Sequence, residues 1–208
     1  MGTPINLGRL FGTYVRVDLT VLLVAAIFVF MGMGQNPTLQ SILDQVTFVI
    51  LLFVSIFLHE MGHAAGARLF GIRTLDVTLT FFGGYARLAQ VPRRAIEDIV
   101  ISFAGPATNL AIAGLLYLWL FSPSALQGME DHTWGILATV MRANLILGLL
   151  NLLPGYPLDG GHIARALLGT FMPVNRARLI VGYIGVAIGF AFIALDLTGG
   201  FGYGLMIG

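Results

Sequence analysis

The chain has 208 residues, of which 57% are hydrophobic and only 10% are charged. Soluble domains usually carry roughly 25% charged residues, so this composition excludes an ordinary soluble domain and indicates a membrane protein. The formal net charge of +1 gives no sign that nucleic acid is a partner, and because the chain lacks cysteine, any metal ion must be bound by His, Asp or Glu.

Five apolar runs reach about the length that a membrane-spanning helix requires. They lie at residues 17–33, 47–70, 96–121, 134–153 and 179–197, and a sixth run begins near Gly200 and stops at Gly208. We therefore predict an all-α polytopic membrane protein of about six transmembrane helices. Residues 1–208 are expected to form one membrane core with a truncated sixth span and no separate soluble domain.

The arginine residues predict the orientation of these spans. Arginines precede the first span and follow the second and fourth, whereas the loops 34–46 and 122–133 contain none. Basic loops generally remain in the cytoplasm. We therefore expect a multi-pass protein of the cell membrane, with its N-terminus and the chemically important segments described below on the cytoplasmic side.

Residues 72–90 interrupt the helical pattern. Val77, Leu79 and Phe81 alternate with threonines, and Gly83-Gly84 offers a turn, which predicts a small membrane-embedded β-hairpin or sheet. Backbone of this kind at membrane depth must be shielded by protein or line a wet cavity. The hairpin edge would then be able to pair with an extended peptide. A plain interfacial loop is the alternative interpretation.

The second span contains the sequence His-Glu-Met-Gly-His at residues 59–63. Two residues four apart project from one face of a helix, about 40° apart at ~100° per residue. His59 and His63 with Glu60 between them follow the pattern of a zinc-peptidase helix, with two nitrogen ligands and a carboxylate base. Two helix-packing histidines are the alternative, but titratable side chains inside a membrane usually mark function. Gly62 and Gly66 would let another helix approach this one closely.

A catalytic zinc ion takes three protein ligands and keeps one position open, so a third ligand is expected. Asp159 is a lone carboxylate after the fourth span, in a segment that Pro154 and Pro157 keep from forming a regular helix. Two alternatives remain open. Asp159 would simply cap a helix over residues 160–171, or His162 would supply the third ligand.

Four motifs occur in an order that matches a known family. They are His-Glu-x-x-His at 59–63, Gly-Gly-x-Ala at 83–86, Ala-Gly-Pro-Ala-Thr-Asn at 104–109 and Asn-x-x-Pro-x-x-Pro-Leu-Asp-Gly-Gly at 151–161. On these motifs the chain resembles the site-2 protease family of intramembrane zinc metalloproteases. The lack of a PDZ insertion places it with the compact prokaryotic type. Asp18 departs from the pattern, because family members often have His at that position.

The resemblance implies a zinc metalloendopeptidase that binds one Zn²⁺ ion through His59, His63 and Asp159 and uses Glu60 as general base. It implies six spans, the central three forming the catalytic core, and peptide-bond hydrolysis within or near transmembrane helices of other proteins in the lipid bilayer. We expect Asn151 to help hold the oxyanion. Many compact members continue into paired C-terminal nucleotide-binding domains; this chain ends before that point, so regulation of this kind is a hypothesis.

A membrane metal-ion transporter that uses His59, His63 and Asp159 as ligands is the main alternative function. It does not explain a glutamate beside the first ligand. Transporters also tend to contain two similar halves, and the sequence shows no internal repeat. An inactive membrane scaffold that retains the motif is a second alternative, against which the intact Glu60 argues.

Overall fold

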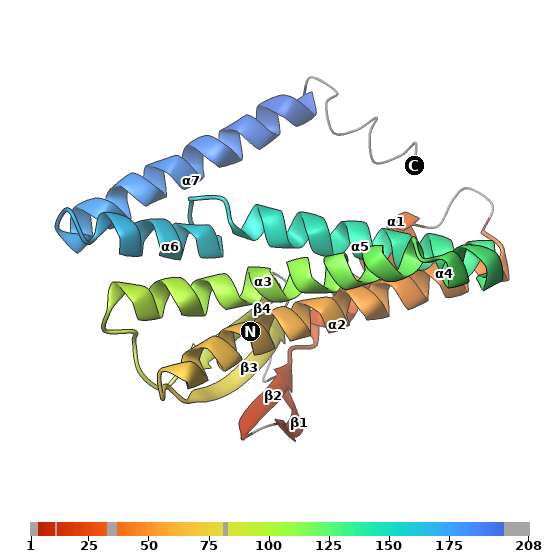
Figure 1. The fold of residues 1–208 in the computed structure, drawn as a ribbon, viewed down its shortest axis with the longest axis horizontal. Helices are drawn as coiled ribbons and strands as arrows, with labels where there is room; N and C mark the ends of the chain where they lie inside the picture. Colours follow the sequence, from red (N-terminus) through yellow and green to blue (C-terminus); the bar gives the residue numbers. More distant parts are fainter. Residues whose placement is uncertain (1–3, 11, 33–36, 81–82, 198–208) are drawn as a thin grey trace.

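The computed structural model describes residues 4–10, 12–32, 37–80 and 83–197 (Figure 1). Its elements in chain order are β1 (Ile5–Leu10), β2 (Thr13–Val17), α1 (Thr20–Gly32), α2 (Leu39–Leu69), β3 (Thr74–Thr80), β4 (Gly83–Leu88), α3 (Ala95–Leu120), α4 (Pro123–Gly128), α5 (Asp131–Asn151), α6 (Asp159–Leu168) and α7 (Val174–Leu197). Helices α2, α3 and α5 pack against one another as a central bundle, the sheet lies beside α2, and α6 and α7 follow on the other side of α3 (Figure 1).

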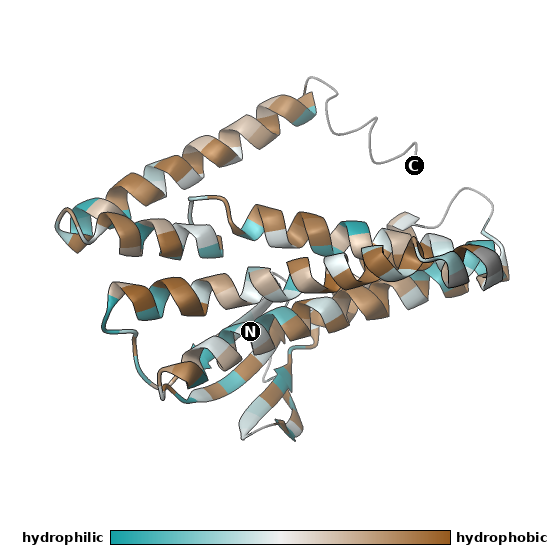
Figure 2. Cartoon of the chain, viewed as in Figure 1, coloured by the Kyte–Doolittle hydropathy of each residue, from teal (hydrophilic) through white to brown (hydrophobic). Residues whose placement is uncertain are grey.

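Four of the described helices, α2, α3, α5 and α7, are long and apolar enough to cross a membrane by length and composition. Their apolar residues dominate most of their length in Figure 2. The chain is thus a mostly helical multi-pass membrane protein with a small sheet, as predicted. Six spans are not confirmed, since α1 has only 13 residues, and the run expected from Gly200 to Gly208 lies outside the described residues.

The first predicted span starts too early in the sequence. Its first residue, Val17, is the last residue of β2 (Thr13–Val17), and α1 begins at Thr20, after Asp18. The carboxylate of Asp18 accepts a hydrogen bond of 2.9 Å from the backbone N–H of Thr20. This bond satisfies one of the N–H groups that a helix start leaves without an intrahelical partner, so the polar residue that was read as part of a span marks its boundary.

The hairpin predicted at 72–90 is confirmed as β3 and β4, which pair antiparallel with Val77 opposite Ala86. The sheet is larger than predicted, because it has four strands in the order β1-β2-β3-β4. β2 pairs parallel with β3, and α1 and α2 form the crossover between them. The added strands therefore fix the N-terminal segment beside the end of α2.

Small residues set the distance between α2 and α3. A Cβ atom on Gly62 would lie 2.6 Å from the carbonyl oxygen of Ala104, and one on Gly66 would lie 3.0 Å from the Cβ of Ala104. Real Cβ atoms essentially never make the contact found at Gly62, and the contact at Gly66 would be tighter than most, so larger side chains would push the two helices apart. The close helix approach expected at Gly62 and Gly66 is confirmed.

Residues 152–158 separate α5 from α6 and turn the chain back toward the bundle. Carbonyl oxygens of Leu152 and Leu153 lie where a Cβ of Gly160 would have to be, and a Cβ on Gly161 would lie 2.8 Å from the carbonyl carbon of Gly155. Glycine is therefore required here because the backbone of the loop touches the start of α6. This contact places the first residue of α6, Asp159, against the central bundle.

Candidate metal centre

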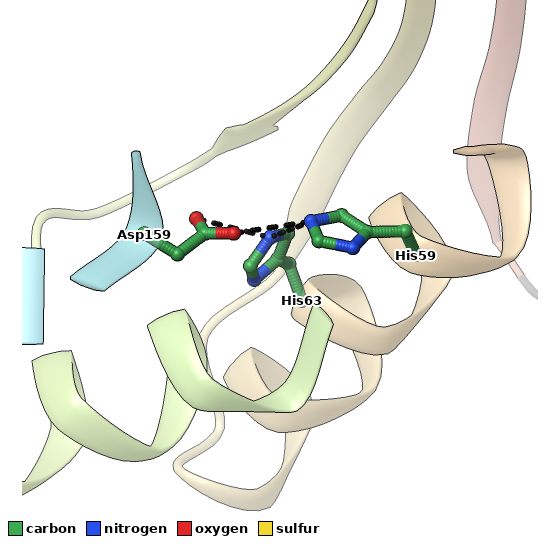
Figure 3. Close-up of side chains that lie close together, drawn as sticks. All are labelled: His59, His63 and Asp159. Carbon is green, nitrogen blue, oxygen red and sulfur yellow. Dashed lines mark hydrogen bonds and ion pairs between the residues drawn. The ribbon is translucent and has the colours of Figure 1, made fainter. Parts of the chain in front are cut away.

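Three potential ligands meet at the junction of α2 and α6. Asp159 Oδ2 lies 3.1 Å from His59 Nε2, and Asp159 Oδ1 lies 3.3 Å from His63 Nε2. The two Nε2 atoms are 3.1 Å apart, and all three ligand atoms lie within 4.8 Å of one another. Figure 3 shows the carboxylate and both imidazoles directed toward a common point. The structure thus brings together the three residues that the sequence analysis selected.

Asp159 does not act as a helix cap. The N-cap of α6 is Leu158, which makes no side-chain capping bond, and Asp159 is the first residue within the helix. Each of its carboxylate oxygens faces one imidazole Nε2 atom, which is the placement expected of a carboxylate metal ligand.

The second nitrogen of each imidazole is occupied by an oxygen acceptor. His59 Nδ1 is hydrogen-bonded to Asn109 Oδ1, and His63 Nδ1 lies 2.7 Å from the carbonyl oxygen of Ile101. Since neither oxygen can donate in this arrangement, both protons belong on Nδ1 and both Nε2 lone pairs point toward Asp159. Metal-ligating histidines are usually oriented in this way. Two such nitrogens and one carboxylate fit zinc, with a fourth position left for water.

Asn109 belongs to a buried polar chain that the sequence analysis did not identify. Its Nδ2 donates to Asn144 Oδ1 at 2.8 Å, and Asn144 Nδ2 donates to Ser55 Oγ at 2.9 Å and to the carbonyl oxygen of Val140 at 2.9 Å. Both asparagines have 0% exposure. The chain links α3, α5 and α2 behind His59. The sequence does show an amide side chain in each of two apolar spans, which could have indicated buried hydrogen bonds. It does not show their partners, because these lie 35 to 89 residues away.

Glu60 is buried beside the sheet instead of within the group of three ligands. It is 6% exposed, and the backbone N–H of Ala86 in β4 donates a hydrogen bond to its carboxylate. A Cβ on Gly84 would lie 2.7 Å from Glu60 Oε1. Glycine at position 84 therefore leaves the space that the glutamate occupies between α2 and β4.

A cavity of about 1210 Å³ contains the potential ligands and Glu60, with walls from α2, β4, α3 and α6. Asn151, at the end of α5, lines the same cavity. His162 also lines it, but its ring packs edge-on against Tyr156 with centroids 5.2 Å apart, and burial lowers its pKa. The described structure groups Asp159, and not His162, with the two imidazoles.

The described structure thus holds a His-His-Asp group and an adjacent glutamate in one cavity of a protein with several long apolar helices, an arrangement typical of metallopeptidases that lie in a membrane. Comparison with protein-family models agrees: Peptidase family M50 matches residues 47–128 and 123–192. The chain belongs to this family, the site-2 protease family. The matched region includes both histidines, Asn109 and Asp159, so it covers the whole group described above.

Individual relatives support the same assignment. The chain is 36% identical to Rip3 from Mycobacterium tuberculosis over 96% of its own length and 55% of that protein. It is 27% identical to the zinc metalloprotease MJ0392 from Methanocaldococcus jannaschii over 95% of its length and 55% of that protein. It thus spans about half the length of these relatives. The solved structure of a site-2 protease from Methanocaldococcus jannaschii superposes with a TM-score of 0.69 at 27% identity, over 95% of this chain and 86% of that one.

Proposed function

We propose that the chain is a zinc metalloendopeptidase that hydrolyses peptide bonds within or near transmembrane helices of membrane-protein substrates. The observation that carries this proposal is the meeting of His59, His63 and Asp159 in one cavity with Glu60. Membership of the family supports zinc as the metal. The four long apolar helices support a substrate that is reached from within the bilayer.

Zinc held by these three side chains would supply Lewis-acid chemistry, which polarises a carbonyl group and makes water acidic enough to ionise near neutral pH. Glu60 would accept the proton of the attacking water on a carboxylate oxygen and then donate it to the leaving amine nitrogen. Its burial beside β4 keeps the carboxylate in one place. Because the side chain of the base is already fixed in position, no conformational entropy has to be lost to place it during the reaction.

Asn151 is the proposed partner of the developing oxyanion. It stands at the C-terminal end of α5, in the wall of the cavity that holds Glu60. An amide N–H aimed at the carbonyl oxygen of the substrate stabilises the negative charge that forms there. The role requires the substrate carbonyl to lie between Asn151 and the metal centre.

The sheet offers a way to hold the substrate. β4 is the terminal strand of the described sheet, next to β3 only, and its residues Gly84 and Ala86 touch Glu60. A substrate helix must unwind before its carbonyl groups can be attacked, because they are hydrogen-bonded within the helix. The unwound segment would add to the outer edge of β4 by strand pairing, which would place its peptide bonds beside Glu60.

The experiment that tests this function uses the purified chain with a candidate single-span substrate, with and without a zinc chelator. We expect cleavage that the chelator stops and that added zinc restores. Glu60→Gln should retain zinc but lose cleavage, whereas Glu130→Gln, at the exposed start of α5, should behave like the unchanged chain. Cleavage by Glu60→Gln would rule out this residue as the base. Chelator-sensitive zinc uptake into vesicles without cleavage would support the transporter instead.

A further inference from the structure

A second cavity lies behind the metal centre. It has a volume of about 800 Å³ and is bounded by the N-terminal hairpin, the last turns of α2 and the start of β3. On α2 it is lined by Met61 and Arg68, which at ~100° per residue project from the side of the helix roughly opposite His59. The cavity is therefore separate from the one that holds the potential zinc ligands.

Positive charge is concentrated in its wall. Arg9 of β1, Arg68 of α2 and Arg73 before β3 all line it, and none of its described lining residues is acidic. We call it the arginine cavity. The guanidinium carbon of Arg9 lies 4.1 Å from the centre of the Tyr14 ring, a cation–π contact that holds this side chain against the hairpin. Three separate chain segments thus contribute arginine residues to the wall of one cavity.

The nearest acidic residue of β3 belongs to a different cluster. Asp76 is 2% exposed; Arg87 Nε donates to its carboxylate at 3.0 Å, and Arg16 lies 3.7 Å from it. Its charge is therefore neutralised on the far side of the strand from Leu75, which lines the arginine cavity. Guanidinium groups match the geometry of phosphate oxygens and bind them with paired hydrogen bonds.

Much of the rest of the wall is apolar, although Thr13 and Thr74 also line it. Met61, Ile72 and Leu75 line the cavity together with alanines of α2. A cavity lined by both arginine and aliphatic residues matches an amphiphile, which has a charged head and an apolar body. It also lies at the C-terminal end of α2, which ends at Leu69, and lipid head groups meet a spanning helix at its ends.

We propose that the arginine cavity binds the phosphate group of an anionic phospholipid. Its apolar wall would contact the apolar body of the lipid and so favour the lipid over a small soluble phosphate. The bound lipid would join the N-terminal hairpin to the end of α2. This inference does not depend on the proposed peptidase activity, since it uses a different cavity and different residues.

The test titrates the purified chain in neutral detergent with dioctanoyl phosphatidylglycerol, dioctanoyl phosphatidylcholine or inorganic phosphate. Bound lipid is counted by native mass spectrometry, and Tm is followed by thermal unfolding. We expect one retained phosphatidylglycerol, a raised Tm and an affinity that falls with added salt. Arg9→Gln/Arg73→Gln should weaken this binding about tenfold or more, by about 1.4 kcal/mol. The control variant Arg176→Gln/Arg178→Gln has the same charge change at exposed positions of α7. It should bind phosphatidylglycerol as tightly as the unchanged chain.

Equal binding of phosphatidylglycerol by the two double variants would overturn the proposal, as would equal retention of phosphatidylcholine. If inorganic phosphate binds as tightly as phosphatidylglycerol, the anion site stands but the selection of a lipid fails. Arg73→Gln alone serves if the double variant does not fold, and it should show a smaller loss in the same direction. Zinc content, measured on every variant, reports whether the rest of the fold is intact.

Discussion

Asn109 Oδ1 accepts a hydrogen bond from Nδ1 of His59, and this single contact decides which nitrogen of the imidazole faces Asp159. An amide oxygen can only accept, so the proton is held on Nδ1 and the lone pair remains on Nε2. Asn109 is itself oriented by Asn144. The direction of the first histidine is thus set by two side chains that do not reach the metal centre.

Asn109→Leu should therefore weaken zinc binding by about 10- to 100-fold, as is usual when the partner of a ligating histidine is lost. Competition against a chromophoric chelator measures the affinity. Asn175→Leu, at an exposed position of α7, is the matched control. An unchanged affinity in Asn109→Leu, in a variant that retains its Tm, would show that the hydrogen bond does not orient His59.

Asp159→Asn should lower zinc content sharply, because the amide is a neutral and weaker ligand than the carboxylate it replaces. His162→Asn is the control, since His162 lines the same cavity but packs against Tyr156. Metal analysis of both purified variants decides between the two residues. Full zinc occupancy in Asp159→Asn together with loss in His162→Asn would reverse the assignment made here.

Gly84→Ala should reduce cleavage by about tenfold or more while leaving zinc content unchanged. The added Cβ would lie 2.7 Å from Glu60 Oε1, so the carboxylate has to move from its position beside β4, and small displacements of a catalytic group are costly. Gly114→Ala in α3 is the control, because a Cβ there meets nothing within 4 Å. Unchanged kcat in Gly84→Ala would show that the position of Glu60 is not critical.

The absence of cysteine from the chain permits a direct test of orientation. The arginine distribution predicts that the loop after β4 is cytoplasmic and that the loop before α5 is not. A single cysteine at Val91, which is 79% exposed, should resist a membrane-impermeant maleimide in intact cells. One at Glu130 should react. Labelling in the opposite sense would invert the predicted topology without affecting the metal centre.

Sequence alone predicted those parts of the site that depend on spacing within one element. His59 and His63 fall on one face of any helix through 59–63, and the hairpin pattern at 72–90 is equally local. Asp159 was the favoured third ligand, but its approach to α2 depends on the contact of the 152–158 loop with Gly160 and Gly161 and on the packing of α6 against α3. The spacing of residues along the chain does not predict these contacts.

Other features were missed because their stabilising partners are distant. β2 is too short to be recognised from its own residues, and its pairing partner β3 begins more than 50 residues later. The role of Asn109 depends on His59 of another helix, 50 residues away. Long-range pairings of this kind override the weak intrinsic preference of a short segment for strand or helix.

The first residue of α6 has one more consequence. α6 packs on α3 and α7, and the described polar link between α6 and α2 runs through Asp159 and the two imidazoles. An ion bound among them would cross-link α2 and α6, two helices that are distant in the chain. Stripping the metal would then loosen α6 as well as stop the chemistry, so zinc would contribute to the rigidity of the fold and would be expected to leave the protein only when that helix moves.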